Sequence, residues 1–132
     1  MSTEEKILNT FRRVAMVGLS TKPERPSRKV AAYLKEQGYK IIPVNPGEKE
    51  ILGEPCYPGL ASIPQPVEVV DIFRRPEEVP VLVEEAIRVG AKAVWLQAGI
   101  VHNAAAQKAA AAGLKVVQNL CIFQAHRRFF GK

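Results

Sequence analysis

The stretch Val14–Ser20 constrains the fold of this chain more than any other. It reads VAMVGLS, four apolar residues followed by a glycine and ending in a small hydroxyl residue. Such a run is typical of a buried parallel strand that ends in a tight turn, where backbone N–H groups can approach the phosphates of a ligand. A short polar loop and a helical pattern follow it. We therefore expect a strand, a ligand-binding turn and a helix in this order.

The alternation of strand and helix continues to the end of the chain. The apolar runs predict strands over 13–17, 39–44, 67–73, 93–96 and 115–118. The helical spacing predicts helices over 3–10, from Ser27 as N-cap to Gly38, from 79 to Gly90, over 103–112 and within 119–130. Strands that alternate with helices of this length form a parallel sheet with helices on both faces. The predicted fold is α/β, a three-layer Rossmann-like open parallel sheet of about five strands.

The 132 residues are expected to form one domain, because no linker or repeat divides them. The segment 1–12 is predicted to be a helix, capped by Ser2 or Thr3, that packs on the sheet. Region 48–66 is rich in proline and glycine, and we interpret it as a surface connection with a short extended piece and a helical turn.

The charge balance favours an anionic partner. Nineteen Lys and Arg against thirteen Asp and Glu give a net charge of +6, which suits a phosphorylated small molecule, a nucleic acid or a membrane surface. No apolar run approaches the ~20 residues of a membrane span, and the N-terminus lacks a signal-peptide pattern, so we expect a cytoplasmic protein. Nucleic acid ranks last, because few aromatic residues lie among the basic ones.

The carboxyl ends of the five predicted strands meet at one edge, where open α/β sheets bind ligands. Their turns contain glycine, asparagine, glutamine and arginine, which any turn could contain, but basic residues beside a helix start favour phosphate over a merely solvated surface. These segments are Gly18-Leu19-Ser20, Asn45-Pro46, Phe73-Arg74-Arg75-Pro76, Gln97-Ala98-Gly99 and Gln118-Asn119-Leu120-Cys121, with the basic loop Lys22, Arg25, Arg28 and Lys29.

Two common nucleotide-binding patterns are missing. The sequence G-x-G-x-x-G is not present after Gly18, because Ser20 stands at the second glycine and Pro23 at the third. Asn45 stands where an acidic residue would hold the ribose of NAD. Ordinary NAD binding is therefore disfavoured, and the absence of G-x-x-x-x-G-K-[ST] excludes a P-loop NTPase.

Taken together, five segments in this order resemble the small CoA-binding domain proteins, which are similar to the nucleotide-binding domain of the succinyl-CoA synthetase α-subunit. The resemblance extends from about Phe11 to His126. The segments that carry it are Val17-Gly18-Leu19-Ser20, Gly38-Tyr39 with Pro43-Val44-Asn45-Pro46, Phe73-Arg74-Arg75-Pro76, Trp95-Leu96-Gln97-Ala98-Gly99 and Val116-Val117-Gln118-Asn119-Leu120-Cys121.

The resemblance implies that coenzyme A or an acyl-CoA binds across the strand ends. The Gly18 turn and 25–28 would meet phosphates, Asn45-Pro46 and 73–76 would line the nucleotide end, and 97–99 with Cys121 would border the pantetheine. The family often has Asp-Arg where this chain has Asn119-Leu120. The implied binding residues are Gly18, Leu19, Ser20, Lys22, Arg25, Pro26, Ser27, Arg28, Asn45, Pro46, Phe73, Arg74, Arg75, Pro76, Gln97, Ala98, Gly99, Asn119 and Cys121.

The sequence offers no catalytic constellation or metal cluster. We interpret His102 as a surface residue at a helix start and His126 as solvated or as complementing a helix dipole. Cys121 is either a buried, inert thiol or one that exchanges with the thiol of the ligand, and Cys56 has less support for a role. The favoured hypothesis is a stand-alone CoA-binding module. The alternative is the CoA-binding subunit of a multi-chain acyl-CoA synthetase or a thiol-exchange enzyme, and a protein partner or a homo-oligomer stays open.

Overall fold

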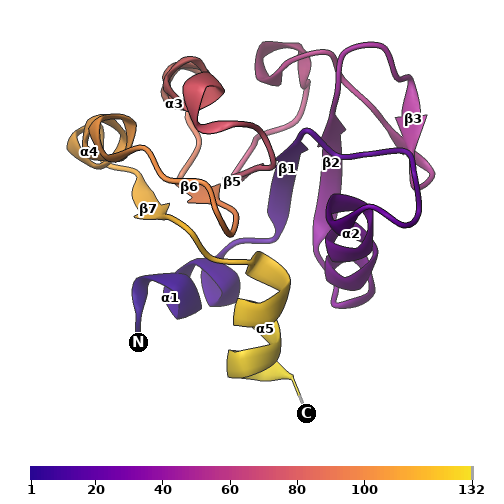
Figure 1. The fold of residues 1–132 in the computed structure, drawn as a ribbon, viewed down its shortest axis with the longest axis horizontal. Coiled ribbons are helices and arrows are strands. Elements are labelled where there is room, and N and C mark those ends of the chain that lie inside the picture. Colours follow the sequence, from indigo (N-terminus) through magenta and orange to yellow (C-terminus); the bar gives the residue numbers. More distant parts are fainter. Residues whose placement is uncertain (132) are drawn as a thin grey trace.

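The computed structural model describes residues 1–131, which form a parallel sheet between two layers of helices (Figure 1). In spatial order the strands are Lys40–Val44 (β2), Arg13–Val17 (β1), Val69–Ile72 (β5), Ala93–Leu96 (β6) and Lys115–Val117 (β7). Every neighbouring pair in this sheet is parallel. The predicted fold class is therefore confirmed, and each strand lies within the range predicted for it.

The helices cover both faces of the sheet, as Figure 1 shows. One layer consists of Thr3–Thr10 (α1), Pro26–Glu36 (α2) and Ile122–Phe130 (α5), and the other of Val79–Arg88 (α3) and Asn103–Ala111 (α4). The strands contribute side chains to both layers because successive side chains of a strand point to opposite faces of the sheet. Val14 and Met16 of β1 pack with the first layer, whereas Ala15 and Val17 pack with the second.

The strand order places a crevice next to the first strand. The chain passes from β1 to β2 at one edge and then returns to β5 on the other side of β1. The direction of winding thus reverses between β1 and β5, and open α/β sheets bind ligands where this happens, beyond the carboxyl ends of the strands. The Phe73 N–H donates to the Val17 carbonyl over 2.9 Å, which holds the two strand ends together.

Region 48–66 is more than a surface connection. It contains a hairpin of Glu50–Ile51 (β3) and Glu54–Pro55 (β4) and a 3-10 turn, Leu60–Ser62 (η1), in agreement with the predicted extended piece and helical turn. However, Ile51 and Leu60 are 3% and 1% exposed and belong to the two hydrophobic cores. The proline-rich composition of this region gave no indication that these two side chains are buried.

Two local predictions about caps and exposure are wrong. Ser27 is not the N-cap of α2, because Pro26 fits the first helical position and moves the cap to Arg25.

His126 is neither solvated nor placed to complement a dipole. It is 6% exposed, its Nδ1 lies 2.7 Å from the Tyr33 hydroxyl, and its ring meets the edge of Tyr39. At the other end, Ser2 caps α1 by accepting the Glu5 N–H at 3.1 Å, as predicted.

Gly18 ends β1 where the chain leaves no space for a side chain. Its φ is +90°, and an added Cβ would lie 2.7 Å from the Phe73 carbonyl oxygen and 2.8 Å from Arg74 Cδ. Gly47 has a similar φ of +99°, but a Cβ there would meet nothing within 4 Å. The two glycines thus have the same conformational requirement and differ only in steric room.

We expect Gly18→Ala to destabilise the protein by about 1 to 3 kcal/mol more than Gly47→Ala, because only the first substitution overpacks the junction of β1 and β5. Urea-induced unfolding of the two variants measures the difference directly. Equal losses of stability would show that the close approach at Gly18 costs nothing.

Candidate functional site

The first of two cavities at the carboxyl edge of the sheet lies between β1 and α2. We call it the β1–α2 cavity, and its volume is about 440 Å³. It is lined by Gly18, Ser20, Thr21, Lys22, Arg25, Pro26, Ser27, Asn45 and Phe73.

Short hydrogen bonds order the loop around the β1–α2 cavity. The Ser20 N–H donates to the Ser27 hydroxyl at 3.0 Å, and the Lys22 N–H donates to the Ser20 hydroxyl at 3.1 Å. The Asn45 amide donates to the Leu19 carbonyl at 2.9 Å and thus joins the ends of β1 and β2. Ser27 is buried, and its hydroxyl accepts the Ser20 N–H, so this side chain fixes the loop instead of capping the helix.

The β1–α2 cavity has a positive electrostatic character. The first turn of α2 contains no acidic residue, and no side chain caps its N–H groups. The positive end of the helix dipole therefore faces this cavity, beside the side chains of Lys22 and Arg25. This combination binds anions, phosphates in particular.

A second cavity of about 420 Å³ adjoins the first, since Pro26 and Phe73 line both. We call it the Cys121 cavity. Its walls are largely apolar, and Cys121, Gln97 and two arginines are also part of them. The lining residues are Pro26, Val30, Phe73, Arg74, Arg75, Gln97, Ala98, Ile100 and Cys121.

The loop that carries Cys121 is held against the end of β6. The Trp95 indole N–H donates to the Leu120 carbonyl at 2.8 Å, and the Gly99 N–H donates to the Asn119 side-chain oxygen at 2.7 Å. Asn119 adopts a left-handed conformation with φ of +57°, which asparagine tolerates better than most residues. Asn119 and Leu120, where the sequence departs from the family pattern, thus serve to position the turn.

Asp71 is a functional candidate that the sequence analysis missed. It is the only aspartate of the chain, it interrupts the apolar strand β5, and it is 0% exposed between Met16 of β1 and Trp95 of β6. Its Oδ1 accepts a hydrogen bond from Gln97 Nε2 at 2.6 Å, and its Oδ2 has no partner among the described residues. Burial raises the pKa of Asp71 to about 8, although the Gln97 hydrogen bond opposes the shift. A lone acidic residue inside an apolar run was the signal available in the sequence.

Most of the predicted binding residues line the two cavities, and some do not. The side chain of Leu19 lies in the core, and Arg28 bonds to the Thr21 carbonyl at 2.9 Å. Arg74 forms an ion pair with Glu78 at 2.7 Å. The predicted residues outside both linings are Leu19, Arg28, Pro46, Pro76, Gly99 and Asn119, whereas Thr21, Val30 and Ile100 line a cavity without having been predicted.

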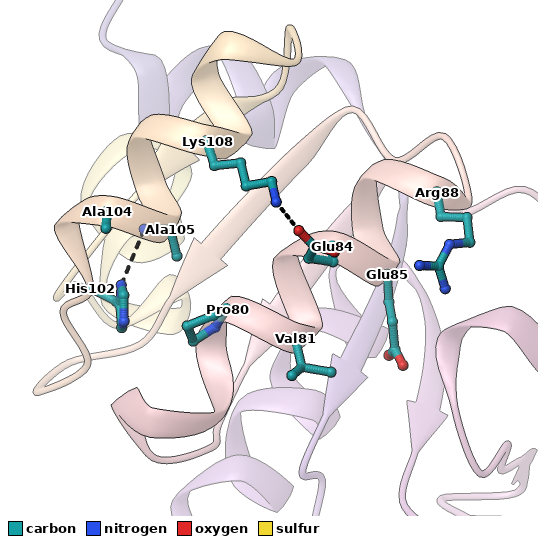
Figure 2. A pocket seen from close by; sticks show the side chains of 9 residues that line it. All are labelled: Pro80, Val81, Glu84, Glu85, Arg88, His102, Ala104, Ala105 and Lys108. Atoms are coloured by element: carbon teal, nitrogen blue, oxygen red, sulfur yellow. Dashed lines mark hydrogen bonds and ion pairs between the residues drawn. The ribbon is translucent and has the colours of Figure 1, made fainter.

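His102 belongs to a different feature, a groove of about 400 Å³ between α3 and α4 (Figure 2). Its ring nitrogen Nδ1 accepts the Ala105 N–H at 3.1 Å and so caps α4, in agreement with the predicted position at a helix start. Figure 2 also shows the ion pair between Lys108 and Glu84, which joins the two helices across the groove.

Two absences concern the described part of the chain. Within residues 1–131, no three His, Cys, Asp or Glu side chains gather in a way that could hold a metal ion. None of the helices in this range combines the length and the apolar character needed to cross a bilayer.

Comparison with known proteins identifies the family. Residues 12–127 match the family described as CoA binding domain. The chain belongs to this family. It is 39% identical over 122 residues to the uncharacterised protein YneT of Bacillus subtilis, a match that covers 92% of this chain and 90% of YneT.

Solved structures agree with the fold. A hypothetical protein from Pyrococcus horikoshii is 42% identical and superposes with a TM-score of 0.94, over 99% of this chain and 94% of that one. A dinucleotide-forming acetyl-coenzyme A synthetase of Candidatus Korarchaeum cryptofilum, 22% identical, shares the fold with a TM-score of 0.76 over 87% of this chain and 27% of that one.

Much larger enzymes contain a related segment. The ADP-forming acetate–CoA ligase I of Archaeoglobus fulgidus is 32% identical over 107 residues, which are 81% of this chain and 15% of the ligase. Ligase II of the same organism is 35% identical over 81 residues, 60% of this chain and 12% of that ligase. This chain thus spans about an eighth of the length of these curated ligases.

The raised pKa of Asp71 predicts how stability depends on pH. An unfolded aspartate ionises near pH 3.8, whereas folded Asp71 keeps its proton to about pH 8. The stability that burial of the neutral acid provides is therefore lost as the pH rises from the first value to the second. Asp71→Asn removes the titration. Between pH 5 and pH 7, we expect the free energy of unfolding of wild type to fall by up to about 3 kcal/mol more than that of this variant. Urea unfolding at both pH values tests this, and parallel losses would contradict it.

Proposed function

We propose that this protein binds coenzyme A or an acyl-CoA across the two adjoining cavities. The observation that carries the proposal is their complementary chemistry. A cationic cavity at a helix N-terminus adjoins a largely apolar cavity whose walls include Cys121 and Gln97. Coenzyme A has the same sequence of groups, with phosphates at one end and a long uncharged arm ending in a thiol at the other.

In this arrangement the phosphates lie in the β1–α2 cavity. Lys22 and Arg25 supply charge-assisted hydrogen bonds together with the first N–H groups of α2. Arg75 is available to the same ligand, since it lines the Cys121 cavity and takes part in none of the ion pairs between described residues. Arg74 contributes less, because a phosphate has to compete with Glu78 for its guanidinium group.

The pantetheine arm then occupies the Cys121 cavity. Val30, Phe73 and Ile100 provide the apolar contacts, and Gln97 provides the polar group that pairs with an amide of the arm. The thiol or thioester end lies beside Cys121.

Isothermal titration calorimetry with coenzyme A tests the proposal. We expect saturable binding, weaker binding of dephospho-CoA because charge-assisted bonds to the 3′-phosphate are lost, and no tight binding of NAD. Tight binding of NAD without saturable heat from coenzyme A would overturn the proposal.

Substitution of one cation localises the phosphates. Arg25→Ala removes a charge from the β1–α2 cavity without removing a helix cap, since the Arg25 side chain makes no cap hydrogen bond. We expect affinity for coenzyme A to fall about tenfold or more. Arg88→Ala is the matched control, because Arg88 lies in the groove between α3 and α4. Equal affinities of the two variants would place the phosphates elsewhere.

A second candidate function follows from the similarity to the acetate–CoA ligases. The domain would then supply coenzyme A to a separately encoded synthetase partner or take part in thiol exchange through Cys121. A defined complex with such a partner, or turnover that Cys121→Ser abolishes, would favour this candidate. A protein that binds coenzyme A and shows neither property acts as a binding module.

A further inference from the structure

A directed chain of hydrogen bonds runs from the interior of the sheet to the wall of the Cys121 cavity. The N–H of Ile122, the first residue of α5, donates to Gln97 Oε1 at 3.4 Å, and Gln97 Nε2 donates to Asp71 Oδ1 at 2.6 Å. The two contacts fix the amide of Gln97 in one orientation, because the opposite orientation would turn its NH2 group toward the Ile122 N–H. Gln97 is 4% exposed, so its side chain has little freedom to turn.

The Ile122 N–H lies at the start of the helix that follows Cys121, and Gln97 and Cys121 line the same cavity. Asp71 itself does not line it. Gln97 is therefore the side chain that connects Asp71 by a hydrogen bond to the wall of this cavity.

We propose that Asp71 is the positioning residue for the thiol end of the coenzyme A site, that it acts through Gln97, and that ligand binding stabilises the protonated form of Asp71. The inference rests on the proposed function. A ligand that fills the Cys121 cavity removes water from beside Gln97 and brings anionic groups closer to the carboxyl, and both effects oppose ionisation.

No other titratable group competes for this role in the part of the chain that the structure describes. The neighbours of Asp71 on the adjacent strands are Met16 and Trp95, and neither has an ionisable side chain. The helices packed on this face contribute Arg28 and Tyr33 from α2 and His126 from α5, with Cys121 at the cap of α5 and Arg74 beyond the end of β5. Burial raises the pKa of Asp71 and the Gln97 hydrogen bond opposes the shift, and none of these groups is among its causes.

Because Asp71 is the only aspartate, its ionisation can be observed without assignment. Protein made by cell-free synthesis with carboxyl-¹³C aspartate gives one labelled side-chain carboxyl resonance. We expect its titration midpoint to rise when coenzyme A is added. A midpoint that stays unchanged or falls, under conditions where calorimetry shows binding, would overturn the inference and leave the proposed function standing.

The affinity for coenzyme A provides the second readout. If the complex keeps the proton, wild type binds about tenfold more weakly at pH 9 than at pH 7, and binding at pH 8 takes up about half a proton from the buffer. Asp71→Asn serves as the matched variant, because the amide imitates the neutral acid and cannot ionise. Ionisation of other groups in the protein and in the ligand occurs with both proteins, so only the difference between the two reports Asp71.

The outcomes separate the two proposals. A larger loss of affinity at high pH in wild type than in Asp71→Asn supports the inference, and the same profile in both proteins overturns it. If Asp71→Asn does not fold, the labelled wild-type protein still decides the question. Absence of coenzyme A binding at every pH removes the proposed function, and this inference with it.

Discussion

The parallel pairing of β1 with β5 is the constraint on which the rest of the structure depends. Backbone hydrogen bonds hold these strands in register from Val14 opposite Val69 to Val17 opposite Ile72. Their ends approach so closely that only glycine fits at position 18. The approach brings the turn after β1 beside Phe73, and Phe73 then forms a wall common to both cavities. A looser junction would separate the cationic cavity from the apolar one, and the proposed function requires both to bind a single long ligand.

The basic residues around this junction divide into two groups with different roles. Arg28 and Arg74 satisfy partners within the protein, the Thr21 carbonyl and the Glu78 carboxylate, and so shape the loops. Lys22, Arg25 and Arg75 line the cavities and take part in none of the ion pairs between described residues. A count of positive charges therefore overstates the number available to a ligand. The excess of six charges indicates an anionic partner, but the hydrogen bonds decide which side chains can reach it.

Sequence patterns predicted the strands and helices well because each strand is a short apolar run and most helices end near a glycine. The same patterns placed the strand-end residues at one edge, since topology alone determines that placement. They failed where tertiary contacts decide. Ser27 has the chemistry of a helix cap but bonds to the Ser20 N–H, and His126 is buried because Tyr33 and Tyr39 surround it. Asp71 was missed because its strand was interpreted by its apolar neighbours alone.

Neither α1 nor the last turn of α5 contributes to the lining of the β1–α2 cavity or of the Cys121 cavity. α1 and α5 pack on the same layer, where Ile7 and Leu8 share a core cluster with Ile122 and Ala125. Figure 1 shows the N-terminus and the last turn of α5 on the side where β1 begins, away from the end of β1. A covalent tether at either end would therefore leave both cavities open. This geometry suits a module that larger polypeptides can incorporate without redesign, and it makes either terminus a suitable attachment point for a fluorophore or a solid support.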